Sequence, residues 1–143
     1  MGAKNSTATR STPSSPINVM SRTAVFPLRD YNLAATLASG QAFRWREANG
    51  PVVEWENIIA GRWARLHVKD KQLHAQTAEP QKDWKWLTEY LQLEVNLKEI
   101  LAAFPKDDPH LAAARKTCRG LRLLKQDPWE TLAGFICSSN KQI

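Results

Sequence analysis

Cysteine is scarce in this chain of 143 residues, and long apolar runs are missing from it. The two cysteines, Cys118 and Cys137, lie far apart and have no partner residues at metal-binding spacing. We therefore expect reduced thiols, and neither a disulfide framework nor a metal site. No apolar run approaches the length that crosses a bilayer, so the sequence predicts no membrane partner.

Acidic residues are absent from the first 29 positions, which carry a formal charge of +4. Residues 30–114 carry −2, and residues 115–143 carry +4. This distribution excludes a continuous basic patch over the middle of the chain. It favours phosphate contacts or a solvated basic helix surface near the C-terminal end, where Arg119 and Arg122 are among the basic residues.

Apolar residues are also sparse in residues 1–24, which are rich in serine, threonine and proline. The composition predicts a disordered tail, with order beginning near Val25. A mitochondrial presequence and a myristoylation site at Gly2 are weaker alternatives for the same stretch.

What the chain does contain is a helical run followed by strands. Asn32 is placed to cap a helix over residues 33–37, and Gly40 follows at a position that suits positive φ. Strands are predicted over residues 41–46, 52–60, 62–68 and 72–77, with turn residues at 48–51 and 69–71. The alternation of polar and apolar residues indicates an antiparallel meander with one covered face.

The period becomes helical from Asp83. A broad apolar face beginning at Trp84 is suited to covering the sheet. Two further helices are expected over residues 97–104, after Asn96, and from Pro109 to about Cys118. The fold class is therefore α+β, an antiparallel sheet covered by helices.

The last expected helix begins at Pro128 and has the most complete start signals. Asp127 is its cap and Glu130 is placed for a capping box. Leu132, Phe135 and Ile136 form an apolar stripe, so we expect this helix to be buried. Because it leads directly into a polar cluster, we interpret the chain as a fragment that ends before the partners of this helix.

Residues 39–45 (SGQAFRW) join a flexible turn to aromatic side chains. If these residues form a strand, Phe43 and Trp45 point to one face. Such a turn suits a flat ligand that approaches main chain, although spacing alone favours a helix-ending glycine before a hairpin.

Three stretches together resemble eukaryotic 8-oxoguanine DNA glycosylases. They are residues 39–45, residues 120–130 (GLRLLKQDPWE) and residues 135–140 (FICSSN). The resemblance implies a TBP-like N-terminal α+β domain over residues 25–118, after a tail at 1–24. It also implies the first helix of a truncated helix–hairpin–helix domain over residues 119–143.

The resemblance implies the recognition half of a base-excision-repair enzyme that removes 8-oxoguanine opposite cytosine by base flipping. In that family a lysine attacks the sugar with the help of an aspartate, and both positions fall beyond Ile143. No catalytic residue is therefore expected in this chain, which should be inactive alone. No cofactor is implied, and the expected partner is damaged double-stranded DNA, bound by a monomer in the nucleus and also the mitochondrion.

Six residues of this chain match the family's binding positions or adjoin them. Gly40 matches the glycine whose carbonyl accepts a hydrogen bond from N7–H of 8-oxoguanine, and Gln41 and Phe43 adjoin it. Asn140 matches the asparagine that contacts the orphaned cytosine. Lys141 and Gln142 stand where the family commonly has two more asparagines.

Two other classes of function remain open. One is a non-enzymatic DNA-binding or protein-interaction module. The other is an alkylated-purine glycosylase of the same superfamily, which fits residues 39–45 less well.

Overall fold

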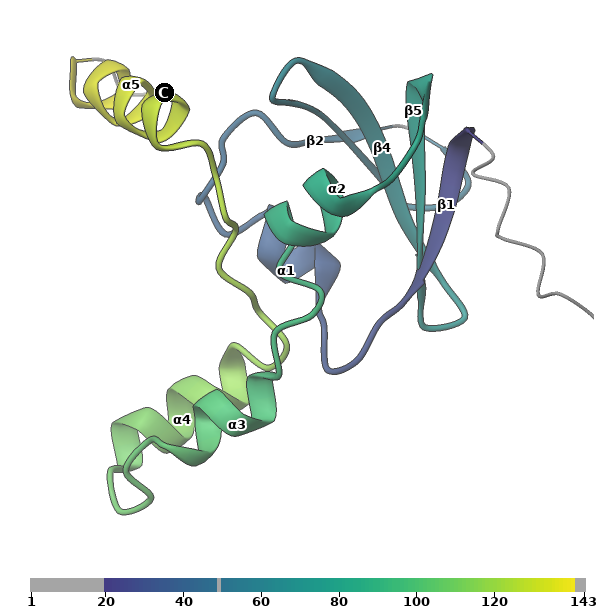
Figure 1. Cartoon of the computed structure of the whole chain (residues 1–143). Coiled ribbons are helices and arrows are strands. Elements are labelled where there is room, and N and C mark those ends of the chain that lie inside the picture. Colours follow the sequence, from purple (N-terminus) through teal and green to yellow (C-terminus); the bar gives the residue numbers. More distant parts are fainter. Residues whose placement is uncertain (1–19, 49, 141–143) are drawn as a thin grey trace, which may run out of the picture.

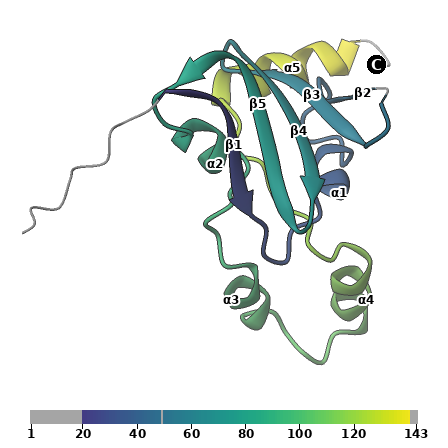
Figure 2. The ribbon, with the colours of Figure 1, turned by 90° about the vertical axis from the view of Figure 1, so that its right-hand side faces the viewer.

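The computed structural model describes residues 20–48 and 50–140. Its centre is a five-stranded antiparallel sheet in the order β1-β5-β4-β3-β2 (Figure 2). The strands are β1 (Ser21–Pro27), β2 (Arg46–Ala48), β3 (Glu54–Ile59), β4 (Arg62–Lys69) and β5 (Gln72–Gln81). The helices are α1 (Leu33–Leu37), α2 (Lys85–Tyr90), α3 (Leu97–Ala102), α4 (Pro109–Thr117) and α5 (Pro128–Asn140).

Two short turns connect the central strands. Ala60 and Gly61 join β3 to β4 with φ values of 47° and 76°, and Asp70 and Lys71 join β4 to β5 with 51° and 58°. Positive φ at both central residues defines the turn whose twist matches that of the flanking strands. The meander predicted from the alternation pattern is confirmed, including its turn at residues 69–71.

The first strand begins earlier than the composition predicts. β1 starts at Ser21 and pairs with β5, with Thr23 opposite Gln76 and Pro27 opposite Gln72. The expected disordered tail is therefore wrong for residues 21–24, and residues 1–19 lie outside the described part. Composition reports how much a segment can bury, whereas an edge strand is held mainly by backbone hydrogen bonds.

The strand expected over residues 41–46 is also wrong, apart from its last residue, because β2 begins only at Arg46. The preceding residues form a loop. Phe43 is 57% exposed and Trp45 is 7% exposed, so the two rings do not share a face.

The apolar core lies between the sheet and the two helices that cover one of its faces, α1 and α2 (Figures 1 and 2). Leu66 and Leu73 of the sheet and Leu87 of α2 are fully buried. Burial of each such side chain contributes about 2 kcal/mol of transfer free energy. The apolar face predicted after Asp83 is thus confirmed as the cover of the sheet.

Helices α3 and α4 project away from the sheet and bury none of their residues (Figure 1). Their predicted caps are confirmed, since the side chain of Asn96 accepts from Lys98 N–H and that of Asp108 from His110 N–H.

Helix α5 begins where predicted, and Asp127 Oδ1 accepts from Glu130 N–H at 2.9 Å. The expectation that it is buried is wrong for the described residues, because Trp129 is 73% and Phe135 70% exposed. The apolar stripe is present, but its members Leu132 and Ile136 are also about half exposed, at 49% and 52%.

Candidate nucleic-acid interface

The segment of residues 120–126 leads from α4 toward α5, and it begins beside the start of α1. Gly120 is buried with φ 78°, and its carbonyl accepts from Asn32 N–H at 2.8 Å. A Cβ at this position would lie 2.8 Å from the Asn32 nitrogen. Only glycine fits this junction without moving backbone.

Arg122 is buried and links its own segment to residues 29–30 and to residue 95 by hydrogen bonds. It is 5% exposed, and its guanidinium donates to the carbonyls of Val95 at 2.8 Å, Arg29 at 3.0 Å and Asp30 at 3.3 Å. Its charged group also lies 5.4 Å from the centre of the Tyr31 ring. The suggestion that Arg122 belongs to a phosphate-facing surface is therefore wrong.

Two tyrosines beside this junction, Tyr31 and Tyr90, have raised pKa values. Tyr31 donates to the Leu91 carbonyl at 2.9 Å, and burial raises its pKa well above 10, against the opposing effect of Arg122. Tyr90 accepts from Trp45 Nε1–H at 3.1 Å, and burial likewise raises its pKa. Both hydroxyls therefore stay protonated near neutral pH.

The loop of residues 39–45 is bound to the 120–126 segment through Gln41. Its Oε1 accepts from Leu124 N–H at 2.9 Å, and its Nε2 donates to the Arg122 carbonyl at 2.8 Å and to Ser39 Oγ at 2.9 Å. The Gln41 carbonyl in turn accepts from Gln126 Nε2 at 2.7 Å. These bonds fix the loop through contacts with residues 122–126, and no strand forms here.

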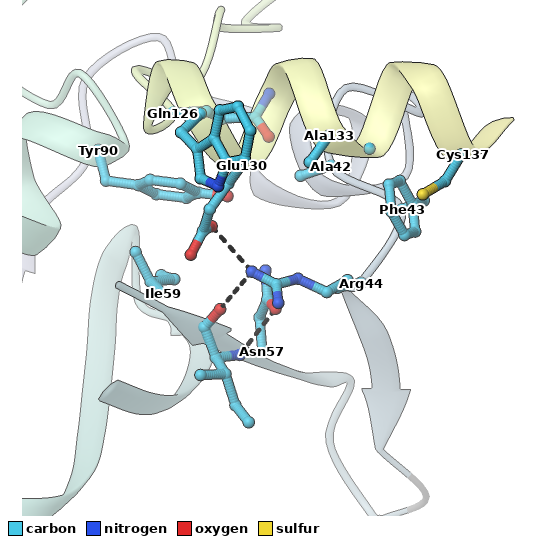
Figure 3. Close-up of a pocket in the computed structure, with 13 residues that line it drawn as sticks. Ala42, Phe43, Arg44, Asn57, Ile59, Tyr90, Gln126, Glu130, Ala133 and Cys137 are labelled. Atoms are coloured by element: carbon cyan, nitrogen blue, oxygen red, sulfur yellow. Dashed lines mark hydrogen bonds and ion pairs between the residues drawn. The ribbon is translucent and has the colours of Figure 1, made fainter. Parts of the chain in front are cut away.

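Two further loop residues, Phe43 and Arg44, contact α5 (Figure 3). Arg44 Nη2 lies 2.8 Å from Glu130 Oε2 and 3.4 Å from the Ile58 carbonyl. The Phe43 ring lies against the helix at Gly134. The Glu130 carboxylate therefore pairs with Arg44, whereas the sequence predicted that it would close a capping box.

A cavity of about 420 Å³ lies between the loop, β3 and α5 (Figure 3). Its lining is mostly apolar, with a few polar groups from Asn57, Tyr90 and the Arg44–Glu130 pair. The lining residues are Ala42, Phe43, Arg44, Asn57, Ile58, Ile59, Tyr90, Gln126, Trp129, Glu130, Ala133, Gly134 and Cys137. No lysine is among them.

The structure brings three of the predicted binding residues to one place. Gly40 is exposed with φ 81°, and nothing lies within 4 Å of where its Cβ would be, so the backbone there is open to a ligand. Phe43 lines the cavity, while the polar atoms of the Gln41 side chain already have partners within the chain. Whether these residues contact a base stays a prediction.

Of the other three predicted residues, the structure describes only the backbone of Asn140. Asn140 is the last residue of α5. Its side chain, together with Lys141 and Gln142, lies outside the described residues. The loop that carries Gly40 therefore contacts the same helix, α5, whose last residue is Asn140.

Within residues 20–48 and 50–140, no cluster of three histidine, cysteine or acidic residues is placed to hold a metal ion. Among the same residues, no helix is long and apolar enough to cross a membrane. Cys118 and Cys137 are free and exposed. The loop and cavity offer exposed main chain at Gly40, the Phe43 ring and the amides of Asn57 and Gln126, beside the Arg44–Glu130 ion pair.

The fold is thus an antiparallel sheet backed by helices, with a glycine-containing loop fastened to an exposed apolar helix. The family model described as the N-terminal domain of 8-oxoguanine DNA glycosylase matches residues 24–132. The chain therefore belongs to this family.

Curated relatives and solved structures agree with this assignment. The N-glycosylase/DNA lyase OGG1 of Arabidopsis thaliana is 30% identical over 128 residues, which cover 82% of this chain and 34% of the relative. The N-glycosylase/DNA lyase of Saccharomyces cerevisiae is 44% identical over 59 residues, which are 40% of this chain and 15% of the relative. The chain thus spans about a third or less of these relatives.

Two solved structures share the fold. MBOgg1 in complex with a low-affinity DNA ligand has a TM-score of 0.72 and 28% identity, covering 84% of this chain and 41% of that one. The Clostridium acetobutylicum 8-oxoguanine glycosylase/lyase, in complex with double-stranded DNA containing cytosine opposite 8-oxoguanine, has a TM-score of 0.67 and 25% identity. That match covers 78% of this chain and 37% of the other.

Proposed function

We propose that this chain is the lesion-recognition part of a bifunctional 8-oxoguanine DNA glycosylase and abasic-site lyase. In this proposal the complete protein turns 8-oxoguanine out of a damaged duplex, opposite cytosine, and removes it. A lysine amine outside this chain attacks the sugar, and the resulting Schiff base permits strand cleavage. Family membership and the activities named for the relatives support the proposal.

The observation that carries the proposal is the conformation of Gly40. Gly40 is exposed, has positive φ, and stands on a loop fastened at Gln41 and at Arg44, and we assign its carbonyl to the base. Guanine N7 is an acceptor, whereas 8-oxoguanine carries N7–H and donates. A fixed carbonyl therefore attracts the oxidised base and repels the normal one.

The second part of the proposal concerns the DNA left behind. We assign Asn140 to the orphaned cytosine, because its amide offers both a donor and an acceptor. We assign Lys141 to phosphate, where it adds affinity without base discrimination, and Gln142 to the same stretch of DNA contacts. The DNA complexes among the structural relatives support a duplex partner for this chain.

The test is Gly40→Ala in a longer protein that contains this chain. One lost hydrogen bond at the base should lower kcat/KM for an 8-oxoguanine duplex by about 10-fold or more. Affinity for an abasic-site duplex should hardly change, because that site has no base to recognise. Asn140→Ala should instead weaken abasic-site binding and reduce the preference for cytosine.

Gly61→Ala is the matched control, since Gly61 also has positive φ with free space around it, at the β3–β4 turn. A thermal melt of each variant separates backbone strain from recognition. If Gly40→Ala weakens lesion and abasic-site binding equally at unchanged stability, Gly40 serves only as a helix-ending glycine.

A second candidate function is a protein-interaction module without enzymatic activity. The exposed apolar side chains of α5, such as Trp129 and Phe135, favour it. A longer protein that binds no 8-oxoguanine duplex would support this candidate over the first.

We also propose that the complete protein is a monomer in the nucleus and the mitochondrion, where its DNA substrate resides. Sedimentation of the purified protein and imaging of a fluorescent fusion test these two statements.

A further inference from the structure

Helix α5 contains a glycine in its interior, Gly134. Glycine weakens a helix there, because it has more freedom to lose than alanine. At Gly134 a Cβ would lie 2.9 Å from Cε1 and 3.5 Å from Cζ of Phe43. The Phe43 ring therefore occupies the space that a side chain at position 134 would need.

This contact belongs to a continuous line along one side of α5. Glu130 and Gly134 are four residues apart and share a helix face. Arg44 pairs with Glu130, and Phe43 lies against Gly134 one turn later. Figure 3 shows both loop side chains on the same side of the helix, beside the cavity.

We propose that Gly134 is a positioning residue for lesion recognition. By admitting the Phe43 ring against α5, it fixes the loop that presents the Gly40 carbonyl relative to the helix that carries Asn140. Gly134 contacts no base and acts only through Phe43. The inference rests on the proposed function and assigns part of its specificity to a residue outside the binding positions.

Gly134→Ala tests this without unfolding the protein. The new methyl collides with the far end of a half-exposed side chain, so the ring can turn toward solvent while the backbone of α5 stays in place. Alanine also favours the helix. We therefore expect an unchanged or higher Tm together with a displaced loop.

The first measurement uses residues 1–143 alone and records amide chemical shifts. Gly134→Ala should shift the amides of Gly40 and Phe43, and the contact between the Phe43 ring and position 134 should disappear from the NOE spectrum. Gly50→Ala is the matched control, because it adds the same methyl in ordinary contact with the Val52 carbonyl at 3.5 Å. Unchanged shifts at Gly40 would overturn the positioning role.

The second measurement uses a longer protein that contains this chain and compares 8-oxoguanine with guanine. Gly134→Ala should lower the ratio of kcat/KM values about 10-fold, with abasic-site affinity unchanged. In a Phe43→Ala background the same substitution should cause no further loss, since the ring it displaces is gone. A purely structural role would lower lesion and abasic-site binding together.

The two proposals fail in different ways. If the wild type shows no preference for 8-oxoguanine, the proposed function is overturned. If the wild type has that preference and Gly134→Ala leaves it unchanged, this inference alone is overturned.

Discussion

At the scale of single residues, Gly120 forms a junction in which no side chain fits. Gly120→Ala combines positive φ with a 2.8 Å approach to the Asn32 nitrogen, which is backbone and cannot turn aside. We expect a loss of roughly 2–4 kcal/mol in the free energy of unfolding, measured with urea. Gly61→Ala has the same strain without the collision and should lose only about 1 kcal/mol. Equal losses would contradict this account.

Arg122 stabilises the fold as a buried donor. Arg122→Met keeps much of the side-chain volume but leaves three carbonyls without their donor. Unpaired buried groups of this kind cost roughly 2–4 kcal/mol in total, and equilibrium unfolding measures the loss. Lys125→Met is the control, because Lys125 is exposed and pairs with Glu89 at the surface. A small effect of Arg122→Met would show that water replaces the guanidinium.

Tyr31 makes stability depend on alkaline pH. Burial raises its pKa above the ordinary value of 10.0, so the folded state keeps a proton that the unfolded chain loses. Its contribution is fully present below pH 10 and is lost as pH rises above it, by up to about 1.4 kcal/mol per pH unit. Tyr90 adds a loss in the same direction.

The measurement for Tyr31 is urea unfolding at a series of pH values above neutrality. Tyr31→Phe should be less stable near neutral pH by about 1 kcal/mol, because the bond to the Leu91 carbonyl is gone, but should show a shallower alkaline decline. An identical slope in both proteins would exclude Tyr31 as the source.

The residues that the sequence could assign are those with local causes. Asn32 and Gly40 follow rules that operate within a few positions, and both have the predicted roles in capping and in positive φ. Arg122 obeys no such rule, because its acceptors lie 27 to 93 positions away in the chain. The charge distribution along the sequence therefore predicted a surface position for Arg122, which is buried.

At the scale of elements, α5 has a complete N-terminal cap but several large exposed apolar side chains. Asp127→Ala removes the acceptor for Glu130 N–H and should cost about 1 kcal/mol. With Trp129 and Phe135 exposed, that loss should fall on the helix alone. Amide exchange should therefore be faster from Phe135 onward than in the strands, and faster still in Asp127→Ala. Protection equal to that of β4 would contradict this expectation.

Helices and strands were predictable where their sequence signals lie within the element or next to it. Turn residues and alternation identify the meander, and cap residues identify α3 and α4. Alternating side chains predicted a strand over residues 41–46, whereas the conformation of residues 41–45 depends on bonds from Leu124 and Gln126. Those bonds join positions more than 80 residues apart, and no local pattern reports them.

At the scale of the whole molecule, the proposed function places recognition in this chain and the catalytic lysine outside it. The lysines of the described residues are exposed, and none lines the cavity beneath α5. Under the proposed function we expect residues 1–143 alone to give no covalent adduct when an 8-oxoguanine duplex is treated with borohydride. A longer active protein is the positive control, and a robust adduct with this chain would show that its nucleophile is present here.

The two short turns at Ala60–Gly61 and Asp70–Lys71 also bear on the order in which the molecule assembles in time. Contacts within β3, β4 and β5 close small loops, which costs little chain entropy. The bond from Arg122 N–H to Thr36 Oγ1 spans 86 positions and must close a large one. Since non-local contacts form slowly, we expect the hairpins to nucleate folding and the glycine loop to acquire its shape last. The part of the chain proposed to recognise damage would then be the part completed at the end.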